Sequence, residues 1–551
     1  MKLQNNNLRS FALLTLVIIY FSFSGYRTPG NVSLIEKYLY SAAYNNFPPD
    51  DLPNWESKDP AKDGYEGVRT NEFYQFLKTL PSAPERSEVI VAVIDDGFDT
   101  EHPDLKENIW NNEKEVNGEA GIDDDENGYV DDFHGWNFLG DRTETTLEVT
   151  REYYRLKKMN VSETDVYFLK VKEKFDEKIE ETIQIKKGVS ETLNEYEKAE
   201  EILREKNITT DPQKLMGLSK GLEGKYQDAA SIILGIYMLF GTDKTELAEL
   251  DKEYETKLKV LFDSLDYEIN TEADLLEKNY GNNNVLELTD GHGTHVSGII
   301  ASKKNGQAPF AKIMCLFAVP TEGDERDKDV GNAIRYAADN GASIINMSAG
   351  KYFSPNPEFV IDAIKYAEEK GVLFVVSAGN EGVDMSNIDN FPKKFYMENG
   401  EKKFFSNVIV VGASTWMKQW SKEKDPMNKN VKYDLAAPFS NYSADVVDIF
   451  APGAEIYSTF PNDKYKMESG TSMAAPVVAG IAAVLKAYFP QLTAAQLKEI
   501  IVSSARQYDG LKVKLKDKSS KELFSKLSKS GGVIDLMNAY KKASEMSTLQ
   551  N

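Results

Sequence analysis

The feature of this sequence that most limits its possible folds is a series of short, continuously apolar runs separated by helical patterns. The first run, residues 89–94, reads Val-Ile-Val-Ala-Val-Ile and is followed at once by Asp95. A run that is apolar on both faces is typical of a central strand in a parallel sheet covered on both sides by helices. Similar runs recur at residues 313–319, 343–347, 372–376, 408–412 and 447–450. The sequence therefore predicts an α/β fold with a doubly wound, mostly parallel sheet.

Helical patterns lie between and after these runs, at residues 330–340, 357–370, 474–489, 493–504 and 533–544. Thr493, with Gln496 three positions later, forms a capping box that marks the start of one helix. Residues 25–88 are predicted to be loop-rich. Because Asp95 follows the first strand directly, we expect it at the carboxyl edge of the sheet, where open α/β sheets place their functional groups.

Residues 141–280 differ in character from the rest, because they are dense in Glu and Lys and poor in Gly and Pro. Apolar residues recur there at spacings of three and four, in two stripes: Leu247, Leu250, Tyr254, Leu258, Leu261 and Leu265, and Phe168, Val171, Phe175, Ile179 and Ile183. Such stripes predict amphipathic helices, as in a helical hairpin or short coiled coil. Residues 229–240 are apolar almost all round but too short to span a membrane, which indicates a buried helix. We interpret the segment as a self-packing helical insertion, and a dedicated binding module is the alternative.

The N-terminus carries a targeting signal. Lys2 and Arg9 precede an apolar run at residues 11–23, and small residues follow at a potential cleavage site. The run is shorter than a comfortable membrane span, which favours a secretory signal peptide over residues 1–24. An uncleaved membrane anchor formed by residues 11–23 is the alternative. We therefore expect an extracytoplasmic protein that is secreted or periplasmic.

The composition of the chain argues against some binding partners and excludes an intramolecular disulfide. The net charge of −23 argues against nucleic-acid or anionic-membrane binding, which needs basic patches. The single cysteine, Cys315, excludes an intramolecular disulfide. Its position in an apolar run predicts a buried core thiol rather than a nucleophile.

Ser472 lies between small residues, just before the apolar helical run of residues 477–485. A helix N-terminus favours developing negative charge, through its unpaired N–H groups and its dipole. A serine still needs a base and a group that orients the base. His292, flanked by glycines at the start of another apolar helix, can act as the base, and Asp95 can hold its tautomer.

Three motifs, at residues 93–97, 292–296 and 470–476, together resemble the signature of the subtilisin-like serine peptidases, in the order Asp, His, Ser. The resemblance implies that Asp95 is the orienting acid, His292 the general base and acid, and Ser472 the nucleophile. It also implies that Asn380, which follows a predicted strand, donates to the oxyanion. The implied activity is a secreted serine endopeptidase working through an acyl-enzyme. The alternative is a catalytically silent or narrowly gated relative whose helical insertion binds a partner.

The resemblance also indicates where an extended polypeptide substrate binds. The segment of Ser348, Ala349 and Gly350 resembles the edge that pairs with the substrate as an added strand. By the same resemblance, the substrate site includes Ser377, Ala378, Gly379 and Glu381. Glu381 is expected near the mouth of the primary specificity pocket, where it would favour basic side chains.

The resemblance divides the chain into five segments. They are a signal peptide or anchor (1–24), an N-terminal extension (25–54), the first part of the peptidase domain (55–140), the helical insertion (141–280) and the second part of the peptidase domain (281–545). His102, His134 and His295 are expected to be structural.

An acidic loop between Asp95 and His292 matches the opening of a calcium loop. Its candidate ligands are Asp123, Asp125, Asn127, Tyr129 and Asp131. The closing glutamate of such loops is absent, since His134 stands there, so a structural calcium site and a solvated acidic turn are both open. Asp104 matches a second calcium position of many subtilases, but the loop at residues 302–307 that would complete the site is short. Catalysis itself is expected to need no cofactor.

Overall fold

The computed structural model describes residues 54–550, except 83, 143, 241–242, 263–274, 276, 278–279, 420–433 and 517. The predicted signal peptide or anchor lies outside the described residues, and so does the N-terminal extension apart from Asn54. The chain divides into two compact units. We call residues 50–155 and 265–551 the sheet unit. We call residues 156–264 the helical unit.

The sheet unit is built on a nine-stranded sheet, counted over the described residues, with the order β12-β15-β9-β8-β5-β4-β1-β3-β2. All neighbouring strands are parallel except the β12–β15 pair. β1 lies between β3 and β4, so the chain builds outward from β1 in both directions, as a doubly wound sheet does. The strands are β1 (Ile90–Asp95), β2 (Gly135–Asn137), β3 (Lys312–Phe317), β4 (Ile344–Met347), β5 (Leu373–Ser377), β8 (Val408–Ser414), β9 (Ile449–Pro452), β12 (Arg506–Gln507) and β15 (Gly532–Val533).

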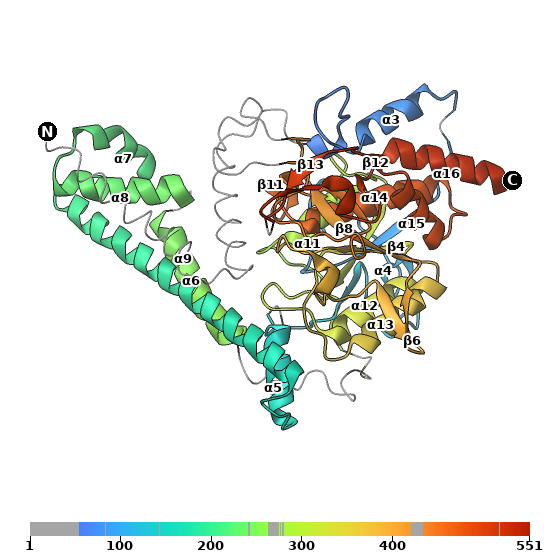
Figure 1. Ribbon diagram of the computed structural model, residues 1–551, viewed down its shortest axis with the longest axis horizontal. Coiled ribbons are helices and arrows are strands. Elements are labelled where there is room, and N and C mark those ends of the chain that lie inside the picture. Colours follow the sequence, from blue (N-terminus) through green and yellow to red (C-terminus); the bar gives the residue numbers. More distant parts are fainter. Residues whose placement is uncertain are drawn as a thin grey trace. The chain divides into compact units, whose positions relative to one another are not determined.

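Helices cover both faces of this sheet. The α-helices whose bounds are described in the sheet unit are α3 (Thr70–Thr79), α4 (Glu113–Val116), α5 (Glu148–Lys158, of which 148–155 belong here), α11 (His292–Ala301), α12 (Asp327–Asp339), α13 (Pro357–Glu369), α14 (Thr471–Tyr488), α15 (Ala494–Ser503) and α16 (Leu536–Gln550). In Figure 1, α14 and α15 lie on one side of β4 and β8, and α12 and α13 lie on the other. α14 packs against five of the strands, β1, β4, β5, β8 and β9, and against α11.

α14 is the one helix in the described part of the chain that is long and apolar enough to cross a membrane. Of its apolar window, 83% is buried inside the unit. Packing in the core therefore accounts for its apolar character.

The six strand predictions are confirmed to within two residues at each end, and the five predicted helices outside the insertion are present. The central strands are buried along almost their whole length, which explains their continuous apolar sequences. The capping box of Thr493 and Gln496 is also present. The loop-rich prediction is wrong for residues 70–79, because α3 buries Phe73 there against Tyr488 and Tyr540.

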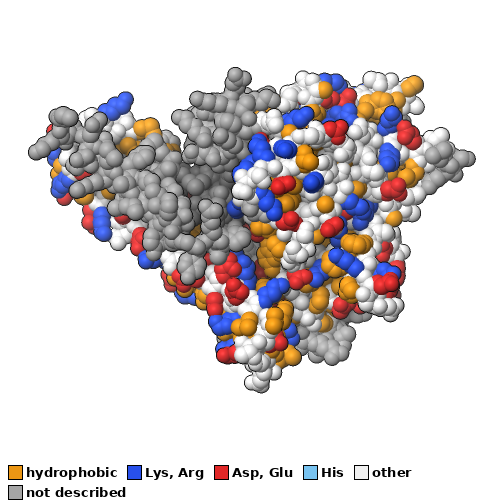
Figure 2. All heavy atoms as spheres, in the orientation of Figure 1, with side chains coloured by type: hydrophobic (Ala, Val, Ile, Leu, Met, Phe, Trp, Pro, Cys, Tyr) orange, Lys and Arg blue, Asp and Glu red, His pale blue; other side chains and the backbone are white. Residues whose placement is uncertain are grey.

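Among the described residues, the sheet unit also has three antiparallel hairpins, and no sequence pattern predicted them. They are β6 (Phe395–Glu398) with β7 (Glu401–Phe404), β10 (Ile456–Phe460) with β11 (Lys464–Glu468), and β13 (Lys512–Lys514) with β14 (Lys521–Leu523). Over the face of the sheet unit seen in Figure 2, Lys and Arg side chains are interspersed with Asp and Glu. The negative net charge is therefore not gathered into a single patch on that face.

The helical unit consists of α6 (Val166–Arg204), α7 (Pro212–Leu218), α8 (Lys225–Phe240) and α9 (Lys244–Val260). α6 packs against both α8 and α9. Its apolar core includes Leu203, Ile233 and Leu247, and the predicted buried helix corresponds to α8. Ile183 departs from the predicted stripe, since its side chain is 41% exposed.

Candidate active site

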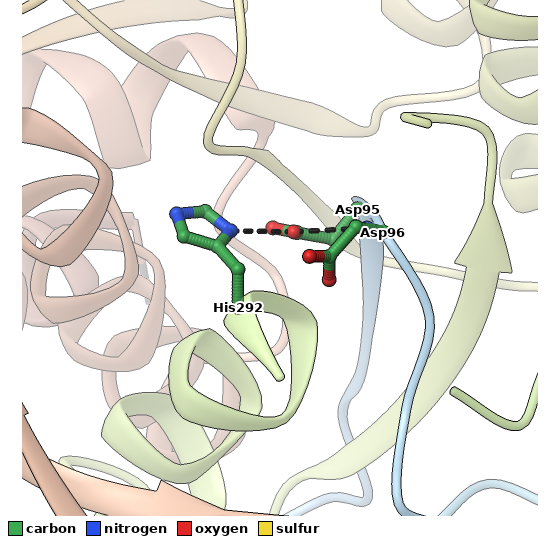
Figure 3. Close-up of side chains that lie close together, drawn as sticks. All are labelled: Asp95, Asp96 and His292. Carbon is green, nitrogen blue, oxygen red and sulfur yellow. Dashed lines mark hydrogen bonds and ion pairs between the residues drawn. The ribbon is translucent and has the colours of Figure 1, made fainter. Parts of the chain in front are cut away.

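Asp95 and His292 meet at the carboxyl edge of the sheet (Figure 3). Asp95 ends β1 and is buried, and its Oδ1 lies 2.6 Å from Nδ1 of His292, the first residue of α11. The helix begins there because Gly291 adopts a left-handed conformation, with φ at 82°, where a Cβ would lie 2.4 Å from Pro461 Cδ. The expected link between an orienting acid and a base is therefore present.

Asp96 also links the end of β1 to the start of α11. Its Oδ1 accepts a hydrogen bond from the N–H of Gly293 at 2.7 Å, which ties the first turn of α11 to the end of β1. A Cβ on Gly293 would lie 2.3 Å from the carbonyl oxygen of Gly97, so only glycine allows this approach. Burial, and then the charge of Asp95, raise the pKa of Asp96 well above its usual value. Asp95, Asp96 and His292 lie close enough together to hold a metal ion, but the Asp95–His292 hydrogen bond already has the geometry of a base and its orienting acid.

Negative charge surrounds the imidazole of His292. Burial lowers its pKa, but the charge and hydrogen bond of Asp95 outweigh burial, and the charges of Asp96 and Glu468 add to the rise. Glu468, at the end of β11, forms an ion pair with Lys466 at 2.8 Å. Burial raises the pKa of Glu468, but His295, Lys466 and His292 lower it to about 2. Glu468 is therefore ionised beside the base.

Ser472 lies in the first turn of α14, as predicted. Its Oγ donates to the carbonyl oxygen of Ser348 at 3.1 Å, and the Ser348 hydroxyl donates to the carbonyl oxygen of Ser472 at 2.8 Å. The serine hydroxyl in this structure is thus directed to the β4 segment and not to the imidazole. Hydrogen bonds between nucleophile and base often form only when substrate is bound.

The amide of Asn380 is held in one orientation. Its Oδ1 accepts hydrogen bonds from the N–H of Thr471 at 2.8 Å and from the Thr471 hydroxyl at 3.0 Å. Because Oδ1 is engaged, Nδ2 faces the other way, 3.5 Å from the position of a Cβ on Gly470. This orientation leaves Nδ2 available to donate beside Ser472.

The predicted substrate-pairing segment begins where β4 ends. Ser348 is buried, Ala349 is half-buried and Gly350 is exposed, so this backbone is open on one side. A Cβ on Gly350 would lie 3.1 Å from the carbonyl oxygen of Phe391.

The other predicted substrate-binding residues lie on either side of Asn380 in the chain. Gly379 has φ at 96°, and a Cβ there would lie 2.6 Å from Asn441 Nδ2. The same amide donates to the carbonyl oxygen of Ala378 at 3.0 Å and to Glu381 Oε2 at 2.5 Å. The carboxylate of Glu381 is therefore turned toward Asn441, a residue that sequence reasoning did not single out. Ser377 is the last residue of β5 and is buried.

The acidic loop brings Asp125 together with Glu115 and Asp132, whose ligand atoms lie within 4.8 Å of one another. Among the other predicted ligands, Asp123 accepts from the N–H groups of Asn127 and Gly128, Asn127 Oδ1 accepts from the N–H of Tyr129, and Asp131 Oδ2 accepts from the N–H of Gly121. Burial raises the pKa of Asp132 to about 6 in spite of its hydrogen bonds, and the charge of Asp125 adds to this. Glu115 lies outside the loop pattern, which is why the sequence did not point to it.

The remaining histidines and the cysteine have structural surroundings. His295 is fully buried with Nε2 3.0 Å from the carbonyl oxygen of Lys466, and His102 and His134 likewise contact carbonyl oxygens. Asp104 accepts from the hydroxyl of Tyr465 at 3.2 Å. Cys315 is fully buried, and burial raises the pKa of its thiol, so the core-thiol prediction is confirmed.

The sequence matches the model of the subtilase family over residues 86–525. A thermophilic serine proteinase of Bacillus sp. (strain AK1) is 34% identical over 251 residues, which are 44% of this chain and 53% of that protein. Thermitase of Thermoactinomyces vulgaris is 34% identical over 37% of this chain and 64% of its own. Subtilisin DY of Bacillus licheniformis is 32% identical over 39% of this chain and 70% of its own. The chain thus spans less than two thirds of the first two relatives.

Among solved structures, that of a cold adapted subtilisin-like serine proteinase is 26% identical to this chain. The match covers 46% of this chain and 75% of that one, with a TM-score of 0.33. The family model covers most of the sequence and includes Asp95, His292, Asn380 and Ser472. The chain therefore belongs to the subtilase family.

Proposed function

We propose that the protein is a serine endopeptidase that hydrolyses peptide bonds of extended polypeptides through an acyl-enzyme on Ser472. The observation that carries the proposal is the 2.6 Å contact between Asp95 Oδ1 and His292 Nδ1, in a chain whose serine lies in the first turn of α14. Family membership and the similarity to serine proteinases support it.

In this mechanism Asp95 keeps the proton of His292 on Nδ1, so that Nε2 can accept the proton of Ser472. The Ser472 hydroxyl leaves the carbonyl oxygen of Ser348 as it turns toward the imidazole and attacks the substrate carbonyl. His292 then gives the proton to the leaving amine, and a water molecule repeats the sequence on the acyl-enzyme.

The negative oxygen that develops during attack is stabilised from two directions. Asn380 Nδ2 is one donor, because Oδ1 of the same amide is held by Thr471. The N–H of Ser472 is the other, since N–H groups in the first turn of a helix have no carbonyl partner within it. The substrate backbone pairs with Ser348, Ala349 and Gly350, which selects extended peptides with little regard to side chains.

The test uses a fluorophosphonate probe and casein. The wild-type protein is expected to be labelled and to degrade casein, and Ser472→Ala is expected to do neither. Absence of labelling in correctly folded wild-type protein would point instead to a catalytically silent relative. Labelling without casein cleavage would point to a narrowly gated peptidase.

We also propose that the protein acts outside the cytoplasm, after cleavage near residue 24. The basic residues before the apolar run at 11–23 support this, as does the common secretion of subtilases. Mass spectrometry of the mature protein from its native host is the test. An intact N-terminus in the membrane fraction would favour the anchor.

We further propose a structural calcium site at the acidic loop, with Asp125 joined by Glu115 and Asp132. The donor chemistry fits, because carboxylate oxygens are the ligands calcium prefers and these lie within 4.8 Å of one another. Asp131 Oδ1 is buried there without a hydrogen-bond partner. A cation would also relieve the repulsion that helps to raise the pKa of Asp132.

Thermal unfolding with added calcium or with a chelator tests this site. Calcium is expected to raise the Tm of the wild type and to have a smaller effect on Asp125→Asn, while the exposed control Asp509→Asn responds like the wild type. An equal Tm with calcium and with chelator would show that the loop is a solvated acidic turn.

A further inference from the structure

A buried charge network surrounds Lys351, the residue after Gly350. The Lys351 side chain is 3% exposed, and its Nζ lies 2.9 Å from Glu148 Oε2 and 2.8 Å from Asp327 Oδ1. It also donates to the carbonyl oxygen of Glu325 at 2.8 Å. Burial lowers the pKa of Lys351, but the charges of Asp327, Glu148 and Glu325 outweigh it and raise the pKa. Lys351 is thus a charged, buried group held from three directions.

Two of the surrounding groups come from the start of α5. Arg151 Nη2 lies 2.5 Å from Glu148 Oε2, and it donates to the carbonyl oxygens of Asp324 at 2.9 Å and Glu325 at 3.2 Å. The N–H of Glu148 donates to Asp324 Oδ2 at 2.8 Å. α5 therefore contacts both the amine of Lys351 and the carbonyl oxygen of Glu325 to which that amine donates.

Lys351 in turn anchors one end of the segment to which we assign the substrate. Its N–H donates to the carbonyl oxygen of Phe391 at 3.1 Å, and its own carbonyl oxygen accepts from the Phe391 N–H at 2.8 Å. The other end, Ser348, exchanges hydrogen bonds with Ser472. The half-buried Ala349 and the exposed Gly350 lie between the two anchors.

We propose that Glu148 and Arg151 are positioning residues for the substrate, which hold Lys351 and thereby keep the Ser348–Gly350 backbone extended for pairing with a peptide. The proposal rests on the proposed function, because it concerns the same substrate segment. Well-packed apolar side chains often stabilise as well as a buried ion cluster, so stability alone does not require charges here. The hydrogen bonds of the charged side chains also fix the direction in which Lys351 is held. Glu148 and Arg151 lie within the predicted insertion, residues 141–280, so the start of the insertion takes part in positioning the substrate segment.

The test compares substrates that differ only in whether they can pair with the segment. One is an acyl-amino-acid ester that ends at the residue before the scissile bond. The other is a peptide ester with the same residue at the cleavage position and three further residues on the N-terminal side of it, which can pair with the segment. Glu148→Gln is expected to lower kcat/KM for the extended peptide ester by at least about tenfold, mainly through KM, and to change the rate on the short ester by less than about threefold.

Asp535→Asn is the matched control. Asp535 is also a fully buried carboxylate with arginine partners, Arg69 and Arg506, and it lies outside the network. This variant is expected to leave the ratio of the two rates as in the wild type. Arg151→Lys keeps the charge but loses the fork-shaped donor, and it is expected to change the ratio in the same direction if Glu148→Gln does not fold. Equal losses on both substrates, or an unchanged ratio, would overturn the proposal.

Hydrogen exchange provides a readout that does not depend on catalysis. Glu148→Gln, or Arg151→Lys in its place, is expected to speed amide exchange in residues 348–351, and Asp535→Asn is expected to leave it unchanged. Faster exchange in a protein that does not react with the fluorophosphonate probe would overturn the proposed function and leave the positioning intact. Unchanged exchange together with normal labelling would overturn the positioning alone.

Discussion

Thr471 offers a sharp test of how the oxyanion donor is oriented. Its hydroxyl donates to Asn380 Oδ1 at 3.0 Å and accepts from the N–H of Gly379 at 3.0 Å. The backbone N–H of Thr471 makes the other contact with Asn380, at 2.8 Å. The side chain is fully buried, and valine has nearly the same shape without the hydroxyl. Thr471→Val therefore removes one of the two hydrogen bonds that orient the amide.

The size of the effect follows from the hydrogen bond that is lost. A net hydrogen bond contributes about 0.5–1.5 kcal/mol. If this amount is lost from transition-state stabilisation, kcat falls roughly 2- to 13-fold. KM should change little, because Asn380 acts on charge that is present only in the transition state. The Gly379 N–H also loses its acceptor, which costs about 1–3 kcal/mol of stability.

A double-mutant cycle with Asn380→Ala separates the two consequences. Asn380→Ala alone is expected to lower kcat by about 10²–10³-fold, the range known for the oxyanion asparagine of subtilisin. In that background Thr471→Val should lower kcat by less than about twofold, because no amide is left to orient. Thr415→Val is the control, since Thr415 is also buried and donates to a carbonyl oxygen, that of Asp434. The same loss of kcat in both backgrounds would refute the reasoning.

Three further predictions concern charge and burial. Glu468→Gln removes a carboxylate that favours the protonated imidazole, so the pKa of His292 falls and the acid limb of the pH profile of kcat/KM moves to lower pH; a shift to higher pH would contradict this. Asp95→Asn should lower kcat by about 10⁴-fold with unchanged circular dichroism, because the imidazole then lacks its orienting acid; a loss below about tenfold would argue against the triad. Cys315 should not react with a thiol reagent until the protein is unfolded, which a colorimetric assay with and without denaturant measures; prompt reaction in the native state would contradict its burial.

The sheet and the catalytic residues could be predicted from sequence because both leave local signals. A strand buried on two faces has to be apolar throughout, so apolar runs such as residues 89–94 and 372–376 predict central strands. His292 and Ser472 each lie in the first turn of a helix, and small residues beside them permit the close backbone approaches that the structure has. These constraints act within a few residues, which is the range that a single sequence reveals.

Groups that matter only through distant partners could not be predicted in this way. Asn441, which donates to Glu381, and Glu468, whose charge helps to raise the pKa of His292, have no local pattern that marks them. Glu115 is separated from the acidic loop that it completes. In each case the partner is set by the arrangement of strands, which a local pattern does not encode.

The start of α5 shows why charge patterns in particular mislead. Glu148 and Arg151 belong to a segment dense in charged residues, and such density ordinarily indicates a solvated helix face. The structure buries both side chains, because Lys351, some two hundred residues further along the chain, pairs with Glu148, and the charge of Asp327 favours the charged form of Arg151. Composition records the charges but not their partners. A buried network and a solvated face therefore look alike in sequence.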